Sequence, residues 1–172
     1  MTPLTLNGAC HCGQVRFRVT LAEGLSTARR CNCSFCRMRG AVALTARVGD
    51  IVFVEGEDRL TRYQFNTRVA EHYFCGTCGI YTHHRRRSNP NEFGVNAACL
   101  EDVSPFDFSE VPVYDGIAHP SDRPQRPGYE IAGVLKYETI EHDDRERQAE
   151  LSPAGAPLSS SPAVAKRNAG DP

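Results

Sequence analysis

Eight cysteines give this 172-residue sequence its clearest chemistry, because seven of them fall into three tight groups. The groups are Cys10-His11-Cys12, Cys31-Asn32-Cys33-Ser34-Phe35-Cys36 and Cys75-Gly76-Thr77-Cys78, and Cys99 stands alone. Disulfide bonds between residues two or three positions apart would close almost no loop, so they would constrain the unfolded chain very little. The same spacing brings several sulfur atoms close to one point, as a metal ion requires. The spacing therefore indicates metal sites rather than disulfides.

Composition and charge indicate the cellular compartment of these thiols and exclude some classes of partner. The first residues contain neither a basic nor an apolar signal-peptide region, and no run of about 18 apolar residues could cross a membrane. We therefore expect a cytoplasmic protein with no membrane partner, in a compartment where thiols stay reduced. With 20 basic against 21 acidic residues, the formal net charge of −1 also argues against a nucleic-acid partner.

A glycine follows each of the outer cysteine groups, where it allows the backbone to fold round the sulfurs, and each group lies beside a predicted strand. Cys75 and Cys78 follow a β-type run, and Cys10 and Cys12 precede one. A thioredoxin-like redox role for the C-x-x-C pair is disfavoured, because no alternation of strands and helices surrounds it. Four thiolates complete a closed, tetrahedral zinc site of the structural type. We favour this pairing of the outer groups because it leaves the middle group intact.

The middle group offers three sulfur atoms within six residues: Cys31, Cys33 and Cys36. Three protein ligands leave the fourth zinc position free for substrate, and a zinc ion held by three thiolates suits thiol activation better than hydrolysis. Spacing does not separate this interpretation from a structural site closed by Cys99 or a histidine. A second partition, in which Cys10 and Cys12 join two of the middle thiols, also stays open.

Apolar and polar residues alternate in many short segments, as is typical of half-buried strands. Val15, Phe17 and Val19 form one such segment. Further strands are predicted over 41–46, 51–55, 59–65, 69–74, 80–83, 93–98 and 133–137. Only 34–39 is predicted to be helical. The pattern predicts an all-β fold whose loops carry the thiols.

The composition changes near residue 140. All 14 aromatic residues lie between Phe17 and Tyr137, and the segment 141–172 is rich in Pro, Ala, Ser and charged residues. Such a segment cannot bury enough apolar surface to offset the entropy lost on ordering. We predict that 141–172 is a disordered tail and that the folded part of the chain ends near residue 140.

Three motifs make the chain recognisable. They are GACHCGQVRF at 8–17, CNCSFCR at 31–37 and FCGTCG at 74–79. On these motifs, residues 6–118 resemble the glutathione-dependent formaldehyde-activating enzymes, a family whose domain is shared with centromere protein V.

The resemblance implies a β-tent, a fold of small antiparallel sheets around two zinc ions, over residues 6–118. It implies a structural zinc held by Cys10, Cys12, Cys75 and Cys78, and a catalytic zinc held by Cys31, Cys33 and Cys36. We expect residues 119–140 to form a C-terminal extension that packs on this domain.

The resemblance also implies an activity of the carbon–sulfur lyase type. The family reaction joins the glutathione thiol to formaldehyde, giving S-hydroxymethylglutathione, and its reverse cleaves a carbon–sulfur bond. The expected partners are therefore a small thiol such as glutathione and an aldehyde. The alternative is a non-catalytic binding module that zinc stabilises.

Four further residues could assist the thiols. Cys99 ends a strand pattern, where a lone cysteine is most often a small buried hydrophobe, although it could also be a fourth ligand or a redox partner. His72, His83 and His84 lie beside the last cysteine pair, and one of them could move the thiol proton. Strand alternation predicts that at most one of His83 and His84 faces the sheet interior.

Two arginine runs, at 29–30 and 85–87, could bind the carboxylates of an acidic thiol in bidentate ion pairs. A solvated face is the simpler interpretation of both runs, and we favour it. Glu71 and Asp102 could support the ligands, but acidic side chains of this kind are usually exposed.

Overall fold

The computed structural model describes residues 2–123, 125 and 128–140. A compact unit extends to Glu138, and a second unit begins at Thr139. The tail predicted over 141–172 lies outside the described residues.

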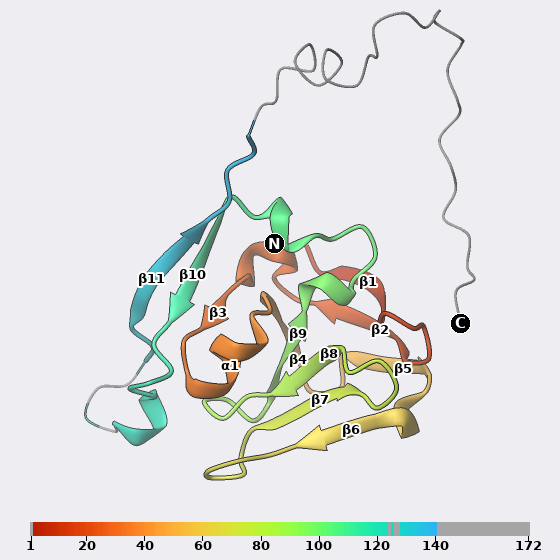
Figure 1. Cartoon of the computed structure of the whole chain (residues 1–172), viewed down its shortest axis with the longest axis horizontal. Helices are drawn as coiled ribbons and strands as arrows, with labels where there is room; N and C mark the ends of the chain where they lie inside the picture. Colours follow the sequence, from red (N-terminus) through yellow and green to blue (C-terminus); the bar gives the residue numbers. More distant parts are fainter. Residues whose placement is uncertain (1, 124, 126–127, 141–172) are drawn as a thin grey trace, which may run out of the picture. The chain divides into compact units, whose positions relative to one another are not determined.

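Short strands dominate the compact unit (Figure 1). The strands are β1 (Leu4–Ala9), β2 (Arg16–Leu21), β3 (Arg30–Cys31), β4 (Ala43–Arg47), β5 (Ile51–Glu55), β6 (Leu60–Tyr63), β7 (Glu71–Cys75), β8 (Tyr81–Arg85), β9 (Glu92–Asn96), β10 (Glu110–Tyr114) and β11 (Ile131–Lys136). The one α-helix of the described residues is α1 (Ser34–Arg39), and short 3₁₀ helices span Gly24–Thr27, Glu57–Arg59, Ala97–Cys99, Pro105–Asp107 and Pro120–Asp122.

The strands form three small sheets, in the orders β1-β2-β5, β4-β9-β8-β7-β6 and β11-β10-β3. Every pairing is antiparallel except that of β10 with β3, where Val113 lies opposite Arg30 and Tyr114 opposite Cys31. In Figure 1 the β10–β11 ribbon lies at the left, β1 and β2 at the right, and β6 to β8 at the bottom. The predicted all-β fold of small antiparallel sheets is confirmed.

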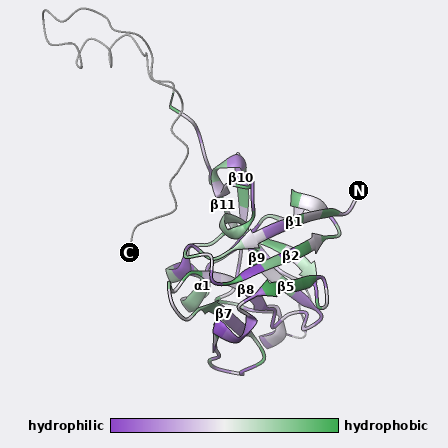
Figure 2. Ribbon diagram, turned by 90° about the vertical axis from the view of Figure 1, so that its right-hand side faces the viewer, coloured by the Kyte–Doolittle hydropathy of each residue, from purple (hydrophilic) through white to green (hydrophobic). Residues whose placement is uncertain are grey.

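The main core lies where β2 meets β4 and β9. Phe17, Val19 and Leu21 of β2 are buried, whereas the arginines between them are exposed, which confirms the predicted alternation. Leu44 of β4 and Val95 of β9 have no exposed surface. Figure 2 shows β5 as hydrophobic along its length, and its Phe53 side chain packs against this core. The buried Val111 of β10 belongs to the same core, which thus joins all three sheets.

The element predictions differ from the structure mainly at strand ends. The helix at 34–39 and the strand at 51–55 are confirmed with the same bounds. The strand predicted over 93–98 is too long, because the Asn96 side chain accepts a hydrogen bond from the Ala98 N–H and starts a 3₁₀ turn. Sequence reasoning missed β1, β3 and β10. Asn-Gly in β1 and Pro112 in β10 weaken the strand pattern, and β3 has only two residues.

β11 falls within 119–140, the segment expected to form an extension on the domain. It pairs with β10 along the whole length of that strand, from Glu110 opposite Lys136 to Tyr114 opposite Ile131. The proposed domain boundary at residue 118 stays a prediction.

Replacing Leu44 by Ala tests the core. Because Leu44 has no exposed surface, we expect the truncation to lower the free energy of unfolding by about 2–5 kcal/mol. Urea unfolding measures the change. Val54→Ala is the matched control, since Val54 is 70% exposed and should change stability by less than about 0.5 kcal/mol. Equal losses in the two variants would contradict this location of the core.

Candidate metal centres

The structure brings together the two outer cysteine pairs. The sulfur atoms of Cys10, Cys12, Cys75 and Cys78 all lie within 4.8 Å of one another. Cys12 Sγ is 3.5 Å from Cys10 Sγ and 3.8 Å from Cys75 Sγ. The edge of a zinc–thiolate tetrahedron is about 3.8 Å, since each Zn–S bond is about 2.3 Å long. The group therefore has the size and donor set of a four-thiolate zinc site.

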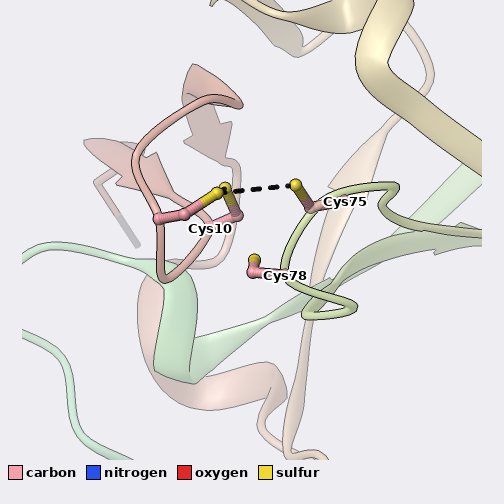
Figure 3. A group of neighbouring side chains, drawn as sticks. Cys10, Cys75 and Cys78 are labelled. Atoms are coloured by element: carbon pink, nitrogen blue, oxygen red, sulfur yellow. Dashed lines mark hydrogen bonds between the residues drawn. The ribbon is translucent and has the colours of Figure 1, made fainter. Parts of the chain in front are cut away.

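Two hairpin-like loops point these sulfurs at one another (Figure 3). In the first loop, the Cys10 N–H donates to the Val15 carbonyl, and the Val15 N–H donates to Cys10 Sγ at 3.3 Å. In the second, the Gly79 N–H donates to the Cys75 carbonyl. Each loop turns back through a glycine in the left-handed region, Gly13 at φ +74° and Gly79 at φ +73°, where other residues would be strained. The role inferred for the glycine after each pair is confirmed.

The four-cysteine group is partly buried and lies apart from the cavity described below. Cys10 is 4% exposed and Cys75 has no exposed surface, whereas Cys78 is half-buried and Cys12 is exposed, and none of the four lines that cavity. Burial raises the pKa of the Cys10 thiol to about 11. Such a thiol becomes a thiolate at neutral pH only beside a cation, which is what a bound metal ion supplies.

The middle cysteines form a second group, hereafter the tripod, consisting of Cys31, Cys33 and Cys36. Their sulfur atoms also lie within 4.8 Å of one another. Cys31 is in β3, Cys33 caps the start of α1, and Cys36 is in its first turn. The Cys33 N–H donates to Cys31 Sγ and the Cys36 N–H donates to Cys33 Sγ, each at 3.4 Å. The local fold thus points three sulfurs at one place, and the partition that kept this group intact fits the geometry.

The charge of the tripod also favours a cation. Hydrogen bonds from the Cys31 and Cys36 thiols lower the pKa of Cys33 to about 2, whereas the contacts with Cys31 and Cys33 raise that of Cys36. These opposite directions arise because thiols this close together disfavour one another's ionisation. Three thiolates this close together require a positive ion between them.

A segment far along the chain covers one side of the tripod. The Asn32 side chain accepts hydrogen bonds from the N–H groups of Gly116 at 2.7 Å and Ile117 at 3.3 Å, which hold this segment against the cysteines. A Cβ atom on residue 116 would lie 2.3 Å from Cys31 Sγ and 2.8 Å from Cys33 Cβ. Only glycine fits at this position.

The tripod opens into a cavity of about 490 Å³. Its wall includes all three tripod cysteines, aromatic side chains, two histidines of the large sheet and six arginines. The arginines are Arg29, Arg30, Arg37, Arg39, Arg86 and Arg87. Asp122 is the one carboxylate among the described lining residues. The cavity is therefore strongly cationic, although the whole chain has a net charge of −1.

Strand alternation sends the neighbouring histidines to opposite faces of the sheet, as predicted. His84 lines the cavity together with His72. His83 instead packs on the other face, against Phe53 and Phe93. Burial lowers the pKa of His72 and of His83 to about 4, and it lowers that of His84 well below the usual value. All three imidazoles are therefore neutral at neutral pH.

The hydrogen bonds of His72 and His84 define their tautomers. Arg39 can only donate, so His72 Nδ1, 3.3 Å from Arg39 Nη1, accepts and its Nε2 carries the proton. The Tyr81 hydroxyl donates to the Gly94 carbonyl, so His84 Nδ1, 2.5 Å from that hydroxyl, is the donor. His84 Nε2 therefore keeps a free lone pair.

The remaining predicted residues have simpler roles. Cys99 is 7% exposed and belongs to the core, as its most common role suggested, and it is in neither sulfur group. Asp102 is exposed, and Glu71 accepts hydrogen bonds from Tyr73 and Arg62 outside the cavity. The solvated face favoured for the run at 85–87 is wrong for Arg86, which is 5% exposed and donates to Glu92 at 2.9 Å.

Sequence reasoning missed the far wall of the cavity, which comes from residues 114–129. Tyr114, Gly116, His119 and Tyr129 lie there. The parallel pairing of β10 with β3 brings this wall to the tripod. No local pattern could have indicated this, because the contact joins segments more than 80 residues apart and β3 is too short to detect.

Comparisons with known proteins agree with this geometry. A family model described as glutathione-dependent formaldehyde-activating enzyme matches residues 5–112, more than half of the chain. The chain therefore belongs to this family, and the resemblance inferred from the three motifs is confirmed.

Two relatives extend this result. A protein of Halomonas elongata, named as a glutathione-dependent formaldehyde-activating enzyme, is 35% identical over 83 residues, which cover 44% of this chain and 52% of the relative. The chain thus spans about half the length of this curated relative. A crystal structure of a Rhodobacter sphaeroides protein is 60% identical, with a TM-score of 0.62, and the match covers 63% of this chain and 99% of that chain.

Among the described residues, no helix is long and apolar enough to cross a membrane.

Replacing Gly116 by Ala tests the contact that covers the tripod. The added methyl group would overlap Cys31 Sγ, so we expect the tripod to lose its metal ion while the four-cysteine group keeps its own. Metal content per chain, measured by elemental analysis, should fall by about half. Gly133→Ala is the control, because a Cβ at residue 133 meets no atom within 4 Å. Unchanged metal content in Gly116→Ala would contradict the close approach.

Proposed function

We propose that this protein joins a small thiol to an aldehyde, and that glutathione and formaldehyde, or a closely related pair, are its substrates. In the reverse direction it would act as a carbon–sulfur lyase. The observation that carries the proposal is the contrast between the two sulfur groups. The four-cysteine group has the four sulfurs that fill a tetrahedral site and lines no described cavity, whereas the tripod has three sulfurs and they lie in the wall of a cavity.

The proposal assigns one zinc ion to each group. Four thiolates suit a closed structural site, in which the ion contributes folding free energy. Three thiolates leave one position for an exogenous ligand, and the ion bound there would hold a substrate sulfur as a nucleophilic thiolate. Reduced thiols are needed at both sites, which fits a reducing compartment such as the cytoplasm.

The proposed reaction needs no oxidant or further co-reactant. The thiol loses its proton, its sulfur forms a bond to the carbonyl carbon, and the π electrons of the C=O bond move onto oxygen. That oxygen then takes up a proton, which gives the S-hydroxymethyl product. The protein must therefore accept a proton near the sulfur and keep the two reactants together.

His84 is the side chain best placed to accept the thiol proton. Of the three candidate histidines, His72 and His84 line the cavity, and His72 has its Nδ1 lone pair engaged by Arg39. His84 Nε2 has a free lone pair, because Nδ1 carries the proton toward Tyr81. Its lowered pKa keeps the imidazole neutral, so that the Nε2 lone pair is not already protonated.

The arginines of the cavity favour a thiol that carries carboxylates. Arg29 and Arg86 share Glu92, and Arg87 makes a bidentate pair with Asp122. Apart from Arg39, which contacts the tripod, Arg30 and Arg37 are the lining arginines without a carboxylate partner among the described residues. Guanidinium groups bind carboxylates in planar, bidentate pairs, and glutathione carries two carboxylates. These two arginines support an anionic substrate.

The second candidate function is a non-catalytic binding module that zinc stabilises. The cavity would then hold a thiol or another small anion without turnover. Both functions predict ligand binding, and only the first predicts a rate.

The first test of the proposed function follows free thiol with a colorimetric reagent in the presence of glutathione and formaldehyde. We expect the wild type to accelerate adduct formation, and Cys33→Ser to lose the effect because the tripod loses a ligand. Cys99→Ser is the control, since Cys99 belongs to neither sulfur group. If no small thiol and aldehyde give a rate that depends on Cys33, the binding module replaces the enzyme.

A second test concerns the proton acceptor. We expect His84→Gln to lower kcat by about 10²–10⁴-fold, the usual contribution of a positioned general base, while glutathione binding is retained. Steady-state kinetics and isothermal titration calorimetry separate the two quantities. His83→Gln should keep kcat within a few-fold, because His83 faces away from the cavity. A normal kcat in His84→Gln would exclude this role.

A further inference from the structure

Arg39 makes an unusual set of contacts behind the tripod. It is the last residue of α1, one turn after Cys36, and its Nη2 donates to Cys36 Sγ at 3.4 Å. Its Nη1 donates to His72 Nδ1 at 3.3 Å. The guanidinium carbon lies 3.6 Å from the centre of the Tyr81 ring. A sulfur, an imidazole and an aromatic ring therefore hold the planar group in one position.

No carboxylate balances this cation. Among the described residues Arg39 has no Asp or Glu partner, and its Nε is buried without a hydrogen-bond acceptor. The other arginines of the cavity that are packed into the protein, Arg29, Arg86 and Arg87, each have an acidic partner. Arg39 is half-buried, and a guanidinium that loses part of its hydration without a counter-charge is destabilised, because the desolvation is not repaid by attraction. A negative charge on a group that Arg39 touches would repay it.

The tripod can supply that charge. Neither His72 nor Tyr81 is anionic at neutral pH, since burial lowers the pKa of the first and raises that of the second. Cys36 Sγ is thus the contact that can become negative, as a thiolate bound to a metal ion. Three thiolates around a divalent ion have a net charge of −1, and one guanidinium balances it. A fourth, exogenous thiolate would add a further negative charge beside the same cation.

We propose that Arg39 is the counter-charge of the tripod, a positioning residue that sets how tightly the three cysteines hold their metal ion and, through it, a substrate thiolate. The part that concerns metal affinity rests only on the metal site, and the part that concerns the substrate rests on the proposed function. The four-cysteine group has no arginine contact of this kind among the described residues, so the effect is specific to the tripod.

The test compares three variants of the full-length protein by metal affinity. Arg39→Met removes the charge. Arg39→Lys keeps the charge, but it loses the planar stacking on Tyr81 and the forked contact. Arg37→Met is the matched control, because it removes a positive charge from the same helix at an exposed position. Zinc affinity is measured by competition with a chromophoric chelator, and the visible bands of cobalt-loaded protein report the number of tetrahedral sites.

We expect Arg39→Met to weaken the tripod by about 10–100-fold, the usual effect of losing an outer-shell partner, while the four-cysteine group is unchanged. Arg39→Lys should stay closer to the wild type than to Arg39→Met, and Arg37→Met should match the wild type. A packing role predicts instead that Lys and Met weaken the site equally, because both lose the stacking. That result, or wild-type affinity in Arg39→Met, would overturn the proposal. If Arg39→Met does not fold, Arg39→Gln removes the same charge with a polar side chain and takes its place.

Catalysis is measured separately on the variants that retain their metal. A higher KM for glutathione in Arg39→Lys supports the substrate part of the proposal, and an unchanged KM overturns that part. Absence of any rate in the wild type would contradict the proposed function, while the affinity comparison would still decide the role of Arg39.

Discussion

Mutual repulsion among closely packed thiolates is the constraint on which this structure depends. Seven sulfur atoms are gathered into two groups, each within 4.8 Å, and the thiolates of a group would repel one another if all of its thiols ionised. A cation at the centre of each group removes the repulsion. The loops around the four-cysteine group, the capping of α1 by Cys33 and the position of Arg39 all serve to place sulfur where a positive charge can reach it.

The two groups meet this constraint in different ways. The outer pairs come from loops more than 60 residues apart, so an ion there would cross-link β1–β2 to the end of β7. The three cysteines of the tripod lie within six residues of one another in the sequence, whereas part of the cavity wall around them comes from distant residues. Tyr114, Gly116 and Tyr129 line the cavity and lie beyond residue 112, where the match to the family model ends. The sulfur ligands thus lie inside the family domain, while part of the cavity wall lies outside it.

Sequence reasoning succeeded where the signal was local. Cysteine spacing identified both sulfur groups, alternation identified β2 with its buried Phe17, Val19 and Leu21, and the helix after Cys33 was predicted with its observed bounds. It failed where long-range pairing decides the outcome. The cavity wall depends on a two-residue parallel contact between β3 and β10, which no periodicity reveals. The burial of Arg86 depends on Glu92 across the sheet, so a run of three arginines was taken for a solvated surface.

The difference in sequence separation also bears on how the protein assembles. Closing a loop of six residues costs less entropy than closing one of more than 60, and long-range contacts form later in folding. The tripod can therefore gather its sulfurs while most of the chain is still unfolded, whereas the four-cysteine group forms only once β1, β2 and β7 are together. In a newly made chain, metal capture by the tripod would come before the sheets close, and metal capture by the outer pairs would mark the completion of the fold.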